Sequence, residues 1–149
     1  MGDQEDEGNA LYGLGTVYSR QGDVEQAVEC HEHALSIIRG SGDRLNEARV
    51  IGDLGNVYAR AGDFRRAIGC YERQLVIVRE VGDRGGEAKA LWNTGWALGA
   101  LGETAQAIEY GEAGLRLFDE VGDEKNAAKA RGQLAQWRQA ARNGGDAIS

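Results

Sequence analysis

Apolar side chains recur along this chain at intervals of three and four residues, in stretches separated by short polar breaks. The first stretch shows the spacing clearly, with Leu11, Leu14, Val17 and Tyr18. Residues spaced in this way lie on one face of an α-helix, whereas a half-buried strand alternates apolar and polar residues. Alternation is absent, and each stretch is longer than an ordinary strand. The pattern therefore predicts helices throughout the chain.

The breaks between the stretches carry the pair Gly-Asp at a spacing of 20 residues. The pair begins at residues 2, 22, 42, 62, 82 and 122, and Gly102-Glu103 occupies the remaining position. Glycine is favoured just past a helix end because it adopts the left-handed backbone conformation without a side-chain clash. Aspartate accepts backbone N–H bonds at the start of the next helix. We therefore predict seven helices, over about residues 4–20, 24–40, 44–60, 64–80, 84–100, 104–120 and 124–142.

The similarity has a true period of 40 residues, because odd helices resemble odd helices and even helices resemble even ones. Equivalent positions of the odd helices hold Leu14-Gly15, Leu54-Gly55, Thr94-Gly95 and Leu134-Ala135. Those of the even helices hold Ala27-Val28, Ala67-Ile68 and Ala107-Ile108. The repeating unit is thus a helix pair, which buries its remaining apolar face by stacking on the next pair. We expect one domain over residues 3–142, built from pairs 3–42, 43–82 and 83–122 and a capping helix 123–142, followed by a flexible tail 143–149.

These positions carry a resemblance to a known family. The first helices show a large apolar residue, then Leu-Gly, then an aromatic residue, as in Leu11/Leu14/Gly15/Tyr18, Ile51/Leu54/Gly55/Tyr58 and Leu91/Thr94/Gly95/Leu98. The second helices carry Ala27/His31/Ala34/Leu35, Ala67/Tyr71/Gln74/Leu75 and Ala107/Gly111/Gly114/Leu115. This pattern resembles the tetratricopeptide repeat. The resemblance implies an all-α fold, a right-handed α-solenoid of three helix pairs plus a C-terminal capping helix.

The repeat departs from the common form of that family in two ways. It has 40 residues rather than about 34, and the chain contains no proline. This longer form, with Gly-Asp-Arg between units, looks like the repeats of Partner-of-Inscuteable-type polarity adaptors. Similar repeats occur at the C-termini of signalling NTPases and regulators in bacteria and fungi.

The last helix differs from the earlier odd helices. Arg131 and Arg138 stand where those helices have Leu or Tyr, which indicates a polar-faced cap of the kind that solenoid ends require. Two glycines in the helix before it, Gly111 and Gly114, weaken that helix by roughly 1 kcal/mol each. We expect them to make room for Trp137.

In this family the first helix of each pair lines a concave surface. Positions on those helices that packing does not use are therefore expected to face a groove that binds a peptide. They are Asn9, Tyr12, Thr16, Arg20, Arg49, Asp53, Asn56, Arg60, Lys89, Trp92, Asn93, Trp96, Lys129, Gln133 and Gln136.

Three of these residues, Arg49, Lys89 and Lys129, lie one repeat apart and form a cationic ladder in an acidic chain. Asn56 and Asn93 are placed to bond a peptide backbone, and their positions resemble asparagines that peptide-binding family members use. The groove hypothesis therefore predicts a ligand with acidic side chains.

Trp92 and Trp96 are four residues apart on one helix face, and exposed aromatic residues are typical interface anchors. They predict that the ligand also carries at least one apolar side chain, which contacts these rings. Two other interpretations stay open. The cations can be ordinary solvated residues that pair with glutamates such as Glu47 and Glu87, and the tryptophans can pack between repeats.

Composition narrows the choice of function. The net charge of −7 disfavours general affinity for nucleic acid or an anionic membrane, because both need a positive field. No apolar run is long enough to span a membrane, and the first residues are acidic where a leader is basic, so we expect a cytoplasmic protein.

Metal and catalytic sites receive little support. His31 and His33 point about 200° apart on a helix, and Cys30 and Cys70 belong to equivalent helices whose axes we expect about 8–10 Å apart. That separation is too large for a disulfide and unsuitable for one zinc ion. We therefore predict no metal, no cofactor and no enzymatic activity. His31 is better explained as a replacement for the half-buried aromatic residue that Tyr71 supplies one repeat later.

The favoured function is a protein-interaction module that binds a partner peptide in the concave groove. A second possibility is a regulatory or sensing segment of a larger signalling ATPase or transcription regulator. A third is self-association of the chain, either through solenoid ends or through the acidic residues 3–7.

Overall fold

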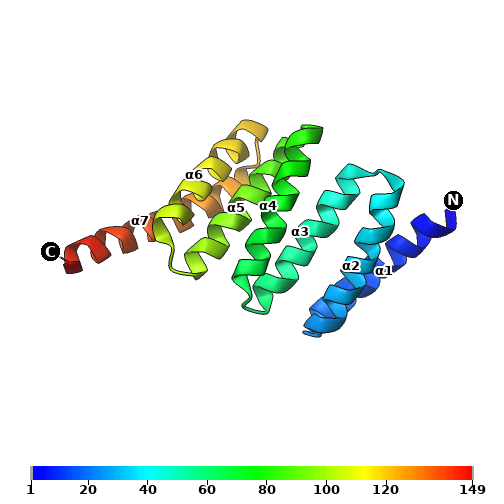
Figure 1. The fold of residues 1–149 in the computed structure, drawn as a ribbon. Helices are drawn as coiled ribbons and strands as arrows, with labels where there is room; N and C mark the ends of the chain where they lie inside the picture. The colour runs from blue at the N-terminus through cyan, green and yellow to red at the C-terminus, as the bar shows by residue number, and fades with distance from the viewer. Residues whose placement is uncertain (1, 149) are drawn as a thin grey trace. The chain divides into compact units, whose positions relative to one another are not determined.

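The computed structural model describes the backbone of residues 2–148 and the side chains of residues 3–144. The described residues form seven helices and no strand (Figure 1). The helices are α1 (Gly2–Arg20), α2 (Val24–Ser41), α3 (Arg44–Arg60), α4 (Phe64–Val81), α5 (Arg84–Ala100), α6 (Thr104–Val121) and α7 (Glu124–Ile148). Number, order and most boundaries agree with the predicted helices.

The glycines between the helices have the predicted left-handed conformation. Gly22, Gly42, Gly62, Gly82, Gly102 and Gly122 all have φ angles between 74° and 84°. The aspartate that follows five of these glycines accepts the backbone N–H three residues on, as Asp43 does from Asn46 at 3.1 Å. Glu103, which follows the remaining glycine, Gly102, makes no such bond. Local chemistry therefore sets where each helix ends and the next begins.

The chain divides into two compact units, Met1–Val81 and Gly82–Ser149. In the first, α1 packs against α2 and α3 against α4, while α2 also packs against α3. In the second, α5 packs against α6, and α6 against α7. One domain over residues 3–142 stays a prediction.

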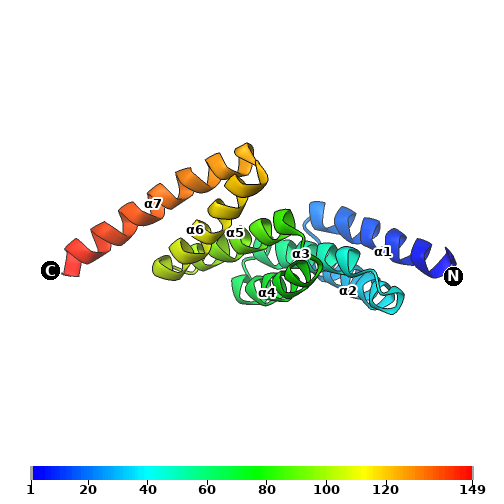
Figure 2. The same ribbon diagram turned by 90° about the horizontal axis from the view of Figure 1, so that it is seen from above.

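Helix α7 is longer than predicted. It continues to Ile148 instead of ending near residue 142 and extends past the end of α6 (Figure 2). The glycines near its C-terminus do not stop it, because a glycine in a helix costs only about 1 kcal/mol and keeps its N–H donor. No proline interrupts the hydrogen-bonded ladder.

In the first two helix pairs, a glycine on the first helix faces a larger side chain on the second. A Cβ atom on Gly15 would lie 2.9 Å from Cε1 of His31, and one on Gly55 would lie 2.7 Å from Cε1 of Tyr71. His31 thus takes the place that Tyr71 takes one repeat later, as predicted. Both rings are almost fully buried.

The prediction that two glycines make room for Trp137 is confirmed for Gly111 and wrong for Gly114. A Cβ on Gly111 would lie 3.0 Å from the Trp137 ring, and one on Gly99 would lie 2.8 Å from it. Gly114 instead faces the α5 backbone, with the Trp92 nitrogen 3.2 Å from its would-be Cβ. Gly114 therefore serves the close approach of α6 to α5, because its side of α6 faces α5 rather than α7.

Candidate functional site

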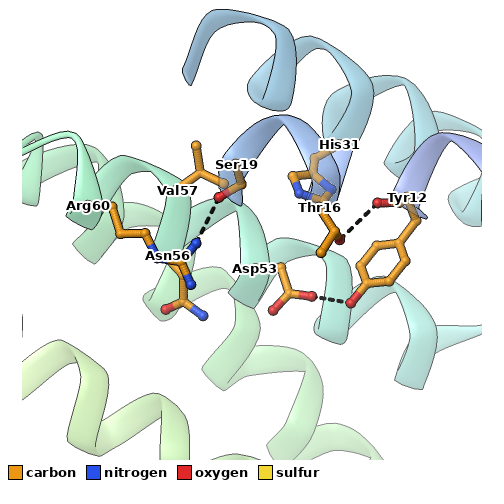
Figure 3. Close-up of a pocket in the computed structure, with 8 residues that line it drawn as sticks. All are labelled: Tyr12, Thr16, Ser19, His31, Asp53, Asn56, Val57 and Arg60. Carbon is orange, nitrogen blue, oxygen red and sulfur yellow. Dashed lines mark hydrogen bonds between the residues drawn. The ribbon is translucent and has the colours of Figure 1, made fainter. Parts of the chain in front are cut away.

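Five of the residues predicted for the groove meet around one pocket in the first unit (Figure 3). The pocket has a volume of about 130 Å³, and α1 and α3 supply its walls while α2 contributes one residue. Its lining residues are Tyr12, Thr16, Ser19, His31, Asp53, Asn56, Val57 and Arg60. The sequence analysis missed Ser19, His31 and Val57 as lining residues. The sequence analysis explained His31 as a packing residue, and nothing in the sequence marked Ser19 or Val57.

One side of the pocket is built on the contact between Tyr12 and Asp53. The Tyr12 hydroxyl donates to Oδ2 of Asp53 at 2.5 Å, which joins α1 to α3. Burial, followed by the bond to Asp53, raises the pKa of Tyr12, so the phenol stays protonated and keeps donating. The Arg49 guanidinium carbon lies 4.8 Å from the centre of the Tyr12 ring, a cation–π distance. Thr16 donates to the Tyr12 carbonyl at 3.0 Å and completes this side.

The other side carries hydrogen-bond donors. Arg60 donates through Nη1 to Oγ of Ser19 at 2.9 Å, again joining α3 to α1. The Tyr71 hydroxyl, from α4, donates to Oδ1 of Asn56 at 2.6 Å. That bond assigns the oxygen of the Asn56 amide to Tyr71, and its Nδ2 group is left as a donor. Burial raises the pKa of Tyr71, so this hydroxyl also stays protonated.

His31 lines the pocket from α2 and is only 1% exposed. Its ring packs on Gly15, and its centre lies 5.6 Å from that of the Tyr12 ring. Nδ1 of His31 has no hydrogen-bond partner among the described residues. An unsatisfied buried polar group costs about 1–3 kcal/mol, so this nitrogen requires an explanation. Burial lowers the pKa of His31, and the opposing effect of Asp53 is smaller, so the ring is neutral at pH 7.

Asn9 and Arg20 lie outside this pocket. Asn9 borders a cavity of about 460 Å³ together with Ile37, near the C-terminal end of α2, and Asn46 of α3. Arg20 is exposed at the C-terminal end of α1.

In the second unit, the predicted groove residues include two tryptophans with different surroundings. The rings of Trp92 and Trp137 are 5.7 Å apart, tilted by 34°. Trp96 is 46% exposed. One tryptophan of α5 thus packs against α7, as the packing interpretation predicted, while the next is partly exposed; whether Trp96 anchors a ligand stays a prediction. Of the remaining residues, Asn93 and Gln133 are half-buried, and Lys89, Lys129 and Gln136 are exposed.

The three cations of the expected ladder are all exposed. Arg49 donates to Oδ1 of Asn46 at 2.7 Å, whereas Glu47 accepts from Arg39 and Arg44 at 3.3 and 2.8 Å. Among the described residues Glu47 therefore pairs with Arg39 and Arg44 rather than with Arg49. The alternative that the cations are ordinary solvated residues stays open. Whether the ladder binds a ligand stays a prediction.

Lys89 belongs to the electrostatic environment of Asp123. Hydrogen bonds from Asn126 lower the pKa of Asp123 most, and the charges of Lys89 and Lys125 lower it further. The cation of the ladder in α5 therefore also supports the start of α7.

The cysteines are unpaired and buried, and burial raises the pKa of both thiols. In the described part of the chain, no three His, Cys, Asp or Glu side chains gather in an arrangement that could hold a metal ion. Over the same residues, no helix has the length and apolar character of a membrane span.

Comparison with known proteins decides the family. Residues 6–75 and residues 88–109 match family models described as tetratricopeptide repeat, and together these matches cover more than half of the chain. The chain belongs to the tetratricopeptide-repeat family. Members of this family generally mediate protein–protein interactions.

Solved structures show the same fold for this tetratricopeptide-repeat chain. The apo form of RapI matches with a TM-score of 0.89 at 17% identity, over 98% of this chain. The chain spans 41% of the length of RapI. The tetratricopeptide-repeat domain of Arabidopsis FLU has a TM-score of 0.73 at 20% identity, over 78% of this chain and 98% of its own.

A third match is the first such domain of Spaghetti (RPAP3), solved with the HSP90 peptide SRMEEVD. Its TM-score is 0.71 at 22% identity, over 93% of this chain and 98% of its own. No curated protein is a significant match to the sequence. At these identities the matches establish the all-α solenoid fold of tetratricopeptide-repeat helix pairs, as the resemblance implied. The closer likeness to Partner-of-Inscuteable-type adaptors and the cytoplasmic location stay predictions.

Proposed function

We propose that this chain binds a partner peptide through the first helices of its repeats, in the concave groove that such stacks form. The observation that carries the proposal is the pocket of the first unit, where five residues chosen for the groove surround one cavity. They come from two consecutive first helices, α1 and α3. A cavity lined by several polar groups is a suitable place for part of an extended ligand.

The charge of the exposed cations favours an acidic ligand. Arg49, Lys89 and Lys129 are exposed at equivalent repeat positions in a chain whose net charge is −7. The peptide bound by Spaghetti, SRMEEVD, has acidic residues together with Met and Val. A ligand of that kind, with acidic side chains and one apolar residue, is what we propose here.

The tryptophans of the second unit favour the apolar anchor. Trp96 is 46% exposed, and its neighbour Trp92 is held against Trp137. A rigid, partly exposed aromatic side chain buries apolar area at low cost in conformational entropy. An apolar side chain of the peptide is expected to contact Trp96.

A second candidate function is supported by the outer face of α1. Leu14 and Val17 are 44% and 47% exposed, whereas the equivalent Leu54 and Val57 in α3 are 2% and 3% exposed. An apolar face of this kind suits a regulatory or sensing segment of a larger signalling ATPase or regulator, or a chain that self-associates. Light scattering over a range of concentrations tests self-association, since a constant monomer mass would remove that candidate.

Peptide selection tests the main proposal. A display library of random peptides is panned against the 149-residue chain, and the enriched sequences are measured for affinity at two salt concentrations. We expect enrichment of acidic residues and an affinity that falls as salt rises. The test variant is Arg49→Ala/Lys89→Ala/Lys129→Ala. The matched control, Arg73→Ala/Arg116→Ala/Lys125→Ala, removes the same number of positive charges from exposed positions. Arg73 and Arg116 lie on second helices, α4 and α6, and Lys125 lies at the start of α7.

The test variant is expected to bind roughly tenfold more weakly or worse and to lose salt dependence, while the control keeps both. Equal affinities for the two variants would contradict the acidic ligand. Failure to enrich any peptide would contradict peptide binding itself.

A further inference from the structure

We propose that the pocket between α1 and α3 binds an uncharged carboxamide, the side chain of an Asn or Gln residue in the partner peptide. The inference rests on the proposed function and names the group that enters this part of the groove. It follows from the acceptor and donor groups that lie next to each other on α3, from the charges around them and from the size of the pocket (Figure 3).

Asp53 supplies the acceptor. Its Oδ2 accepts from Tyr12 at 2.5 Å, and within residues 3–144 no donor is bonded to its Oδ1. The two contacts of Tyr12, with Asp53 and with Arg49, hold this carboxylate at the pocket wall. A ligand N–H group that reaches Oδ1 forms a charge-assisted hydrogen bond.

Asn56 supplies the donor, three residues from Asp53 on the same face of α3. Because Tyr71 donates to its Oδ1 at 2.6 Å, its Nδ2 group is the part of the amide that remains for a ligand. Arg60, bonded to Ser19 at 2.9 Å, brings positive charge beside it. A ligand carbonyl oxygen therefore finds its donor next to the carboxylate of Asp53.

The charged residues around the pocket disfavour both a negatively charged and a positively charged ligand group. A ligand carboxylate suits Asn56 and Arg60 but is repelled by Asp53. A ligand ammonium suits Asp53 but meets Arg60 on one side and Arg49, over the Tyr12 ring, on the other. A carboxamide presents both a donor and an acceptor and has no net charge, so it satisfies Asp53 and Asn56 at once.

The buried ring of His31 also belongs to the lining of this pocket. The ring is 1% exposed, and Nδ1 has no partner among the described residues. Its two nitrogens lie against Gly15, where a Cβ would be 3.0 and 3.1 Å away, so the ring contributes its surface to the pocket and we assign no ligand hydrogen bond to Nδ1.

The size agrees with this occupant. A cavity of about 150 Å³ holds benzene, which has six heavy atoms. The pocket volume of about 130 Å³ therefore has room for the three heavy atoms of a carboxamide and the methylene carbons attached to it.

The first experiment uses small probes and does not depend on the partner. Propionamide, sodium propionate and propylammonium chloride are titrated into the ¹⁵N-labelled 149-residue chain and followed by NMR. Propionamide is expected to shift the side-chain amide of Asn56 and the backbone amide of Gly15 with millimolar affinity, roughly tenfold tighter than either ion. Equal affinity for the three probes, or no shift with any of them, overturns the proposal.

Two isosteric variants test the roles of Asp53 as the acceptor and Asn56 as the donor. In Asp53→Asn, the amide oxygen stays with the Tyr12 hydroxyl and Nδ2 faces the pocket, so propionate becomes the preferred probe. In Asn56→Asp, the bond from Tyr71 is kept and a carboxylate oxygen replaces Nδ2, so propylammonium becomes preferred. Glu72→Gln, an exposed carboxylate of α4, is the matched control and keeps the preference for propionamide.

Circular dichroism confirms that each variant is folded before it is titrated. An unchanged probe order in both folded variants contradicts the proposal. If one variant does not fold, the other decides the outcome, because their predicted preferences are opposite.

Peptide selection separates this proposal from the proposed function. Peptides selected by the wild-type chain are expected to contain Asn or Gln at one position, with Glu or Asp there in peptides selected by Asp53→Asn. Peptides that bind without an amide at any common position would contradict the inference and leave peptide binding standing. Probe binding without any selected peptide would contradict peptide binding and leave the pocket chemistry standing.

Discussion

The first helices of the two units have the same register but different surfaces. In α3, Asp53 and Asn56 belong to a polar pocket, whereas the equivalent positions in α5 hold Asn93 and Trp96. Trp96 is 46% exposed. First helices with the same repeat register thus present different side chains at equivalent exposed positions.

The difference depends on what faces the repeated glycine of each pair. In the first unit, His31 fills the space beside Gly15 and contributes its ring to the pocket. In the second unit the residue equivalent to His31 is Gly111, so the α6 backbone itself lies against Gly95, and Trp137 from α7 packs on Gly111 and beside Trp92. A residue at the interface between paired helices therefore determines the chemistry of the surface outside it.

The largest expected effect is the loss of Trp137. Trp137→Ala removes the ring that packs on Gly99 and Gly111, and we expect the free energy of unfolding to fall by about 3–5 kcal/mol. Chemical denaturation followed by circular dichroism measures this change. Gln136→Ala, at the exposed neighbour, is the control and is expected to change stability by no more than about 0.5 kcal/mol. An unchanged midpoint for Trp137→Ala would show that the stability of the chain does not depend on this ring.

A smaller effect is expected from filling the close contact in the first unit. Gly15→Ala places a Cβ 2.9 Å from the His31 ring, so we expect a loss of about 1–3 kcal/mol. Gly13→Ala, two residues away on the same helix, meets nothing within 4 Å and is expected to gain about 1 kcal/mol from helix propensity. Thermal melts of the two variants compare them directly. Equal shifts would show that the ring does not pack against Gly15.

The titration of His31 gives an effect that depends on pH. Its folded-state pKa is lowered by burial, so the unfolded state binds the proton more readily. The stability contributed by the neutral ring is therefore present above the unfolded pKa of about 6.5 and is lost as pH falls toward the folded pKa. The slope is at most about 1.4 kcal/mol per pH unit.

The measurement compares the free energy of unfolding between pH 8 and pH 5.5 in the wild type, His31→Phe and the exposed control His33→Gln. The wild type and His33→Gln are expected to lose stability more steeply than His31→Phe. Parallel profiles for all three chains would mean that His31 is not held neutral by its surroundings.

The smallest effect is expected at the surface of α7. Arg138 lies 2.9 Å from Glu112, and both side chains are about half exposed. Exposed ion pairs contribute about 0–1 kcal/mol, so the coupling energy in an Arg138→Ala/Glu112→Ala double-mutant cycle should lie in that range. A larger coupling would mean that charge, and not Trp137, holds α7 against α6.

Much of the fold could be predicted because its determinants are local. The left-handed glycines and the capping aspartates act within a few residues, so helix ends such as Arg60 and Ala100 were predicted within one residue. The end of α7 was not predicted correctly, because the glycines in its last turns weaken the helix without stopping it. The place of Gly114 was also wrong, because spacing shows which face of α6 it occupies but not which neighbour that face meets.

The candidate site was predicted less completely. Repeat register brought Tyr12, Thr16, Asp53, Asn56 and Arg60 to one surface of the helices. Their spacing in the sequence said nothing of which atoms would bond. The pairing of Arg49 with Asn46 and Tyr12, in place of Glu47, depends on side-chain reach between helices.

The sequence alone determined the helices, their ends and the 40-residue register, because hydrogen bonding and backbone conformation at Gly-Asp are local properties. Only the tertiary structure decided that Tyr12 donates to Asp53, that Tyr71 orients Asn56 and that the His31 ring closes the pocket. These contacts join residues from four helices. Their distances depend on how closely the helices pack, and that is a property of the folded chain as a whole.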